Sequence, residues 1–293
     1  MTPKADAGIT KGMIFAGCSY TWGQGLYYYS NLSTLRDQAN PWGYWNIYTG
    51  SHHRFRESVR YPRLVAKHFN TFEWVHPQNG GANDQNVNYW KNCFINREPG
   101  NMVRGSEHGS WDRTEAIEYE EVSCIVFQLT QWMRDIFRCD VDGEVIEIPI
   151  QWYWENNPNR DRPHKDIYEK YLNDNNLVHG EMNDELTVKG LNNVKEFLME
   201  CESKGIKTYI LSWPREFIKF LERDEWLNER WIKFNYNGKK YQCIEHMNLD
   251  NPEFEIYKDY ENFKIPPQDS HPSLKCHRVI ADNIIEFIEN KKL

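Results

Sequence analysis

The feature that most constrains the fold is a set of short apolar runs that contain no charged residue. Residues 122–129 (VSCIVFQL) are apolar, β-branched and uncharged, which is typical of a strand. Residues 12–18 (GMIFAGC) form a similar run that ends in small residues. Parallel strands that are covered on both faces show continuous apolar runs rather than alternation. We therefore expect these two segments to lie in a buried parallel sheet.

Elsewhere in the chain, apolar residues recur at helical spacing. Residues 186–204, for example, carry Leu186, Leu191, Val194 and Leu198, and a glycine follows them. The same reasoning predicts further strands at 72–76 and 206–212, and helices at 60–70, 83–96, 186–204 and 271–292. Strands that alternate with helices imply an α/β fold, in which helices wrap a parallel sheet.

Three excursions interrupt this alternation, at about 27–60, 136–185 and 215–265. Asp142-Gly143 and Asn237-Gly238 lie between β-prone segments, and both dipeptides favour two-residue hairpin turns. The excursions that hold these hairpins contain no substantial apolar core of their own. We therefore expect residues 1–293 to form a single domain with inserted hairpins and loops.

Composition excludes several classes of partner. Lys and Arg number 35 against 43 Asp and Glu, a formal charge of −8, so no nucleic-acid partner is expected, because a basic face is needed to bind phosphate backbones. No run approaches the ~18 apolar residues of a membrane helix, so no membrane association is expected. Residues 1–11 lack the apolar segment of a signal peptide, which predicts cytoplasmic synthesis. The seven cysteines form no CxxC pair, so we expect neither a disulfide framework nor a metal site.

The first candidate for chemistry is Ser19, in the segment GCSYTWG directly after the first expected strand. Open α/β sheets bind ligands at the carboxyl ends of their strands. Main-chain N–H groups of a following turn or helix would then point at whatever Ser19 attacks. The alternative is a plain strand-to-loop turn, and the heptapeptide alone favours neither. Cys18 is a weaker candidate nucleophile, because a small residue at a strand end is more often buried and inert.

The second candidate is the segment DSHPS, which precedes the last expected helix. A serine hydroxyl is a weak nucleophile until a base removes its proton, and that base needs a carboxylate to orient it. Asp269 and His271 lie two positions apart, and in an extended segment such residues project to the same side. The alternative is that Asp269 or Ser270 only caps the helix. His277 is an alternative base, although a packing role suits it better.

The third candidate is the segment NGGAND, between the second expected strand and its helix. Consecutive glycines allow a ligand to approach the backbone closely and to meet N–H donors. Gly81, with Gly80 as the other register, would supply such a donor. The alternative is an ordinary turn that ends in Asn83 as the helix cap.

Taken in order, these three segments resemble the SGNH hydrolase family, also called GDSL-like esterases. The resemblance implies a flavodoxin-like three-layer α/β/α sandwich with a mostly parallel five-stranded sheet. It also implies hydrolysis of esters, often acetyl esters on carbohydrates, without a cofactor or metal. Ser19 would be the nucleophile, His271 the base and Asp269 its partner, and the N–H groups of Ser19 and Gly81 would form the oxyanion hole.

The chain departs from the family pattern in two places. The family spaces its acid and base as D-x-x-H, which would put Gln268 in the place of the acid. The family's third block carries an Asn that donates to the oxyanion, whereas residues 128–134 (QLTQWMR) contain none. Thr130, Gln131 or Arg134 is expected to replace that donor, or Asn83 from the second block. The loss of one oxyanion donor typically costs about 2.7–4 kcal/mol of transition-state stabilisation.

Three functions follow as expectations. The first is a serine esterase that acts on an acylated carbohydrate, with Tyr20, Trp22 and Arg134 as substrate-binding residues and aromatic loops at 20–48, 152–154 and 226–236 as walls. The second is a weak or inactive structural or carbohydrate-binding component of a bacteriophage particle, since the opening GCSYTWGQGL is similar to phage-encoded SGNH-like chains. The third is an acyltransferase that uses the same triad. Expected partners are an acylated carbohydrate or other small ester, virion proteins or a second copy of the chain.

Overall fold

The centre of the protein, in a computed structural model, is a sheet of four parallel strands. The strand order is β2 (Phe72–Val75), β1 (Gly12–Ala16), β4 (Val122–Leu129) and β7 (Lys207–Ser212). The residues described are 11–31, 50–75, 81–95, 104–105, 117–132, 136–141, 144–149, 165–174, 182–264, 266–267 and 269–291. These strands form the parallel sheet that the apolar runs predict.

The two edges of this sheet carry only short additions. At one edge, β3 (Arg104–Gly105) pairs antiparallel with β2. Beyond β7, Ile210 and Trp231 form a single parallel bridge. The described residues therefore do not supply a fifth full-length parallel strand.

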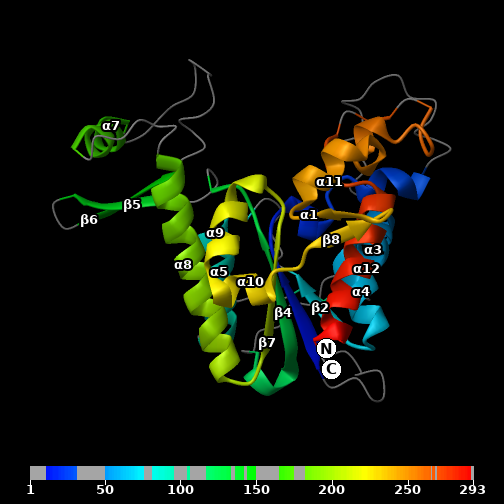
Figure 1. Ribbon diagram of the computed structural model, residues 1–293, viewed down its shortest axis with the longest axis horizontal. Helices are drawn as coiled ribbons and strands as arrows, with labels where there is room; N and C mark the ends of the chain where they lie inside the picture. The colour runs from blue at the N-terminus through cyan, green and yellow to red at the C-terminus, as the bar shows by residue number, and fades with distance from the viewer. Residues whose placement is uncertain are drawn as a thin grey trace.

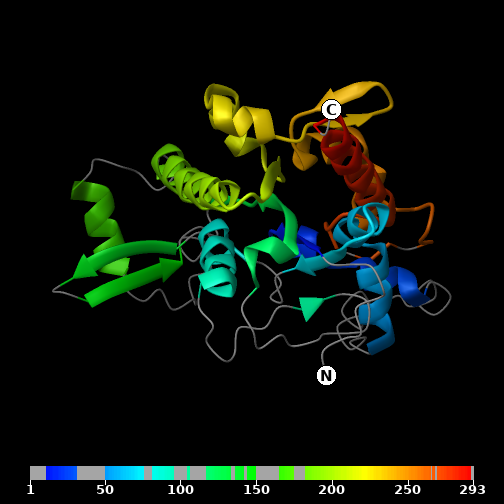
Figure 2. The same cartoon turned by 90° about the horizontal axis from the view of Figure 1, so that it is seen from below.

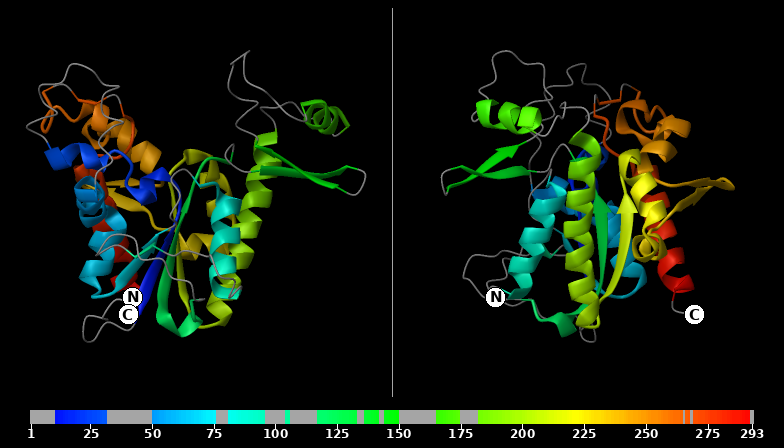
Figure 3. Two further views of the ribbon diagram at one scale, coloured as in Figure 1. Left: turned by 180° about the vertical axis from the view of Figure 1, so that it is seen from behind. Right: turned by 60° about the vertical axis from the view of Figure 1, so that its left-hand side comes forward.

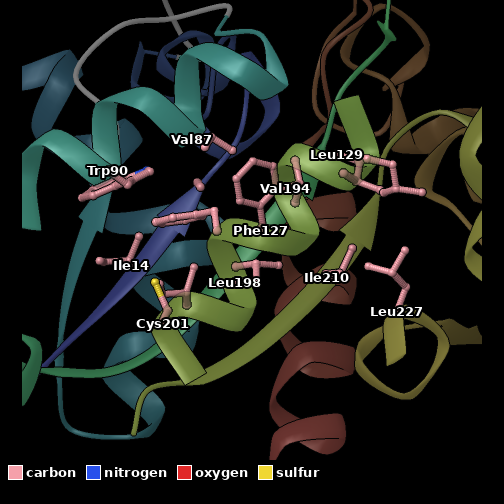
Figure 4. Close-up of a cluster of buried hydrophobic side chains, with 14 of the residues drawn as sticks. Ile14, Val87, Trp90, Phe127, Leu129, Val194, Leu198, Cys201, Ile210 and Leu227 are labelled. Atoms are coloured by element: carbon pink, nitrogen blue, oxygen red, sulfur yellow. The ribbon is translucent and has the colours of Figure 1, made fainter. Parts of the chain in front are cut away.

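Helices cover both faces of the sheet (Figure 1, Figure 2). On one face, α5 (Asn83–Ile95) and α8 (Met182–Ser203) pack on Ile14 and Phe127. On the other, α4 (Tyr61–His68) and α12 (Leu274–Asn290) pack on Met13 and Phe15. Successive residues of β1 thus alternate between the two layers, as the period of a strand requires. Figure 4 shows the first of these cores, in which side chains of β1, β4, α5 and α8 interdigitate.

Two hairpins lie within the expected excursions. β5 (Ile136–Val141) and β6 (Glu144–Pro149) pair antiparallel, and Val141 stands opposite Glu144, whereas residues 142–143 lie outside the described residues. β8 (Phe234–Tyr236) and β9 (Lys239–Tyr241) are joined by Asn237 and Gly238, whose φ values of 50° and 76° fit a type I′ turn. Both hairpin predictions are confirmed. Figure 3 shows that β5, β6 and α7 (Lys165–Asp174) project away from the central sheet.

Short helices complete the described part of the chain. They are α1 (Ser19–Trp22), η1 (Leu26–Asn31), α3 (Gly50–Val59), η3 (Tyr119–Glu121), η5 (Arg215–Phe217), α9 (Ile218–Arg223), α10 (Glu225–Arg230), α11 (Ile244–Asp250), η6 (Pro252–Phe254) and η7 (Ile256–Lys258). None of the helices in the described ranges has both the length and the apolar character needed to cross a membrane.

Candidate functional site

Ser19 is the first residue of α1, immediately beyond the carboxyl end of β1. Its residue is 2% exposed, and its Oγ is buried with no hydrogen-bond partner among the described residues. Cys18 precedes it in an extended conformation, as the N-cap of α1. The strand therefore delivers Ser19 to the edge of the sheet where α/β folds bind ligands.

Polar side chains from neighbouring elements hold this turn in place. Asn86 of α5 accepts from the Gly17 N–H through Oδ1 at 3.0 Å. Thr21 Oγ1 donates to Gln128 Oε1 at 2.7 Å and lies 2.7 Å from the Tyr61 hydroxyl. All of these groups are buried, so each bond fixes the turn relative to a neighbouring strand or helix.

Cys18 belongs to the same network rather than to the chemistry. Its Sγ accepts from Gln128 Nε2 at 3.0 Å, and its side chain is buried. This contact gives the Gln128 amide nitrogen a partner, and the amide oxygen accepts from Thr21. This agrees with the interpretation of Cys18 as a buried residue at a strand end.

Asp269 and His271 form a close pair. Asp269 Oδ1 is 2.5 Å from His271 Nδ1, and it also accepts from the main-chain N–H of His271 at 2.9 Å. The Ile256 N–H donates to the His271 carbonyl and the Tyr257 N–H to the Asp269 carbonyl, each at 3.0 Å. Residues of η7 thus hold the pair in an extended segment. From the sequence, η7 was expected to belong to the excursion at about 215–265.

Tyr20 brings the opening turn and the closing segment together. Its ring lies 5.5 Å from the His271 ring and 4.8 Å from the Trp213 ring, measured between centroids, both in edge contact. Its hydroxyl donates to the Ser270 carbonyl at 3.5 Å, across 250 positions of the chain. Ser19 Oγ itself makes no hydrogen bond to His271. The two expected reactive residues, Ser19 and His271, are therefore both next to Tyr20, but no hydrogen bond joins Ser19 Oγ to His271.

Gly81 lies against the turn that carries Ser19. A Cβ added to Gly81 would stand 3.5 Å from the Gly17 carbonyl and 2.8 Å from Asn86 Nδ2. Only a glycine fits this approach without displacing Asn86. Its main-chain N–H is therefore brought to the same edge of the sheet as Ser19, whereas Gly80 lies outside the described residues.

Two of the expected replacement donors, Asn83 and Thr130, bind each other. Asn83 Nδ2 donates to the Thr130 carbonyl, and the Thr130 N–H donates to Asn83 Oδ1, both at 2.9 Å. The Asn83 amide thus holds the end of β4. Thr130 Oγ1 is buried and has no hydrogen-bond partner among the described residues, like Ser19 Oγ.

Among the described residues, the expected substrate-binding side chains do not form an open aromatic wall. Tyr20 is buried, and the guanidinium of Arg56 covers the Trp22 ring at 3.3 Å from its centroid. Tyr27 and Phe234, in two of the expected wall segments, are also buried. Aromatic side chains here serve the cores, because burial of their large apolar area stabilises the fold. Arg134, residues 32–48 of the first wall segment and the wall segment 152–154 lie outside the described residues.

His277 does not stand in the place of the base. Its Nδ1 accepts from the Tyr61 N–H at 3.2 Å, and its ring stacks on the Tyr61 ring. Burial, with a smaller contribution from the positive charge of Arg60, lowers the pKa of His277 to about 3. This histidine is therefore neutral and structural.

Two site residues, Gln128 and Asn86, were missed by the sequence reasoning. Gln128 is the only amide in the run 122–129, and a polar side chain in a buried strand must find partners. That signal was available. Asn86 lies within a helix that is rich in polar residues, so nothing in the sequence distinguished it from its neighbours.

A scan against protein-family models, a search of curated proteins and a search of solved structures returned no match. Among the described residues, no group of three His, Cys, Asp or Glu side chains is placed to hold a metal ion. The function is therefore argued from the geometry of the chain's own residues.

Proposed function

We propose that the protein is a serine esterase of the SGNH type, which hydrolyses acyl esters, in the first instance acetyl esters, on a carbohydrate. One observation carries the proposal. The Asp269–His271 pair and the turn that bears Ser19 are joined through Tyr20 at the carboxyl edge of the sheet. The fold alone does not require that chain segments so far apart in sequence place a serine, a histidine and an aspartate at the same edge of the sheet.

The proposed reaction begins with proton transfer from Ser19 Oγ to His271 Nε2 as Ser19 attacks the ester carbonyl. Asp269 holds the proton on Nδ1, which leaves Nε2 as the acceptor, and its charge stabilises the imidazolium. The imidazolium then protonates the leaving alcohol. Water hydrolyses the acyl-enzyme with His271 again as the base, so the serine is regenerated.

The oxyanion of the tetrahedral intermediate requires donors at the same edge. The N–H groups of Ser19 and Gly81 are the proposed pair, and the Thr130 hydroxyl is a third donor. A buried hydroxyl with no partner supports this role for Thr130, because such a group is costly unless it serves a ligand or a water molecule.

The finer fold assignment belongs to the same proposal. A flavodoxin-like three-layer sandwich of five strands would place Ser19 and His271 at one edge, and the four parallel strands between two helical layers are compatible with it. The single bridge between Ile210 and Trp231 lies where the fifth strand would run.

A second candidate is an inactive SGNH-like component of a phage particle that binds carbohydrate without cleaving it. The observation that favours it is the burial of Ser19 Oγ without a hydrogen bond to His271. A catalytic serine in this state needs a rearrangement before substrate can reach it.

Turnover of p-nitrophenyl acetate separates the two candidates. The esterase proposal expects the wild type to release p-nitrophenol well above the rate of the Ser19→Ala variant. Thr21→Ser, which keeps a hydroxyl two positions away, is the matched control and should retain turnover. Equal background rates for wild type and Ser19→Ala would reject the proposal for simple esters. Acyl transfer to an added alcohol, in place of hydrolysis, would assign the acyltransferase alternative.

A further inference from the structure

The junction between α3 and α4 holds helix α1 from two sides. Arg60, the N-cap residue of α4, donates from Nη1 to the main-chain carbonyl of Trp22 at 3.4 Å. The hydroxyl of the next residue, Tyr61, lies 2.7 Å from Thr21 Oγ1. Both contacts reach the last two residues of the helix that begins with Ser19.

Arg60 is itself fixed to the central sheet. Its residue is 3% exposed, and its Nη2 lies 3.6 Å from Oε1 of Glu73, a fully buried residue of β2. The second oxygen of Glu73 lies 3.1 Å from Arg63 Nη1. Buried charges persist in proteins when they are paired, so the guanidinium of Arg60 has little freedom to leave this position. It links β2 to the end of α1.

The end of α1 approaches this junction unusually closely. Gly23 follows the helix with φ of +82°, and an added Cβ would stand 3.1 Å from Arg60 Cβ and 3.4 Å from Arg56 Cγ. The Arg56 guanidinium covers the Trp22 ring. Positive charge beside the last carbonyls of a helix is favourable, because those carbonyls have no partner within the helix.

We propose that Arg60 is a positioning residue for Ser19. By holding the Trp22 carbonyl, and with Tyr61 holding Thr21, it fixes the rotation of the single turn of α1. That rotation sets where the Ser19 hydroxyl and N–H point. The consequence for catalysis rests on the proposed function, whereas the restraint of α1 by Arg60 does not.

The test compares Arg60→Lys with Arg63→Lys. Lysine keeps a positive charge beside Glu73, but its single ammonium lacks the fork that reaches both the carboxylate and the Trp22 carbonyl. Arg63→Lys changes the other ion pair of the same glutamate and is the matched control. If Arg60→Lys does not fold, the double variant Arg60→Met/Glu73→Met is compared with Arg63→Met/Glu73→Met, because both lack the shared carboxylate and only the first lacks the donor to the Trp22 carbonyl.

Two measurements are made on each variant: amide hydrogen exchange at residues 19–23, and kcat and KM for p-nitrophenyl acetate. We expect Arg60→Lys to exchange about tenfold faster there and to lose about 10- to 100-fold in kcat, with KM changed less than about twofold. Arg63→Lys should change neither the exchange rate at residues 19–23 nor kcat. Equal exchange in the two variants would overturn the proposal that Arg60 restrains α1. Faster exchange in Arg60→Lys with unchanged kcat would overturn the proposal that Arg60 positions Ser19. If the wild type does not hydrolyse the ester, the proposed function fails for this substrate, while exchange still decides whether Arg60 holds α1.

Discussion

At the scale of single residues, the spacing of Asp269 and His271 works because one carboxylate oxygen serves two donors. Asp269 Oδ1 accepts from both the ring and the main chain of His271. An aspartate that bonds to the backbone two residues further on forms a local turn of its own. The two-residue spacing thus orients the imidazole without the longer spacing that the family uses.

Replacing Asp269 tests this arrangement. Asp269→Asn presents an amide that can donate to Nδ1, which favours the tautomer with its proton on Nε2 and removes the base. We expect kcat for ester hydrolysis to fall by about 10³–10⁴-fold. Gln268→Ala is the control, because the family spacing would put the acid there. Steady-state kinetics that show the larger loss for Gln268→Ala would contradict our assignment of the acid.

His277 gives the protein a defined sensitivity to acid. The folded-state pKa of His277 is about 3, below the ordinary value of about 6.5. Between these pH values the unfolded chain therefore binds a proton on this histidine and the folded chain does not. The free energy of unfolding should therefore fall as pH drops from about 6.5 towards 3, by roughly 1 kcal/mol per pH unit from this group.

Urea unfolding at several pH values measures that slope. His277→Asn offers Tyr61 an amide oxygen in place of Nδ1 and cannot be protonated in this range. It should be less stable than the wild type near neutrality, yet lose less stability on acidification. An unchanged slope would show that His277 does not carry the effect.

Part of the site could be predicted at this scale and part could not. Ser19, Gly81, Asp269 and His271 were predicted as site residues because small residues at strand ends and a D-x-H segment suit a known chemistry, and the structure brings their segments to one edge of the sheet. The partners of Arg60 could not be read from the sequence, because Glu73 and Trp22 reach it only through the fold. Glu73 still left a signal, as a lone carboxylate in the apolar strand 72–75.

At the scale of elements, the strands and long helices could be predicted because each has its own hydrophobic pattern and is followed by residues that end it. The prediction for 122–129 matches β4 at both ends, and Gly205, with φ of +85°, follows α8 as expected. The last helix begins at Leu274 rather than His271, because Ser273 accepts from the Cys276 N–H and caps it. The role of η7 was not predictable, since its main-chain bonds to 269–271 follow no side-chain pattern.

Gly25 is the point where the segment after α1 meets the segment of the acid. Its φ is +84°, and an added Cβ would stand 2.3 Å from Ile256 Cδ1 and 3.0 Å from Asp269 Oδ2. Gly25→Ala should therefore lower the free energy of unfolding by about 1–3 kcal/mol and also lower kcat, because Asp269 must shift.

Gly205→Ala is the matched control for Gly25→Ala. Gly205 has φ of +85°, but nothing lies within 4 Å of an added Cβ. The control thus carries the same backbone strain without the contact, and it should leave kcat unchanged. If thermal and kinetic measurements give the two variants equal effects, the packing of Gly25 against Asp269 is not important.

At the scale of the whole molecule, the sheet separates two cores that share the strands. Leu198 lies in the core under α5 and α8, and Ile284 in the core under α4 and α12. Each of the four parallel strands, β1, β2, β4 and β7, contributes residues to both cores. Loss of either core should therefore destabilise the protein as one cooperative unit rather than as two.

Truncation in each layer tests this prediction. Leu198→Ala and Ile284→Ala should each lower the free energy of unfolding by about 2–5 kcal/mol and shift a single transition. Met199→Ala, on the same helix as Leu198 but 47% exposed, should change it by less than about 0.5 kcal/mol. Two separate transitions in calorimetry would show that the layers unfold independently.

The most direct test of the central claim is covalent labelling with a fluorophosphonate, followed by mass spectrometry of the labelled peptide. We predict one adduct on Ser19 in the wild type, no adduct in Ser19→Ala and strongly slowed labelling in His271→Ala. Labelling of another residue, or equal labelling of wild type and His271→Ala, would contradict the claim that a serine of the opening turn and a histidine of the closing segment act together.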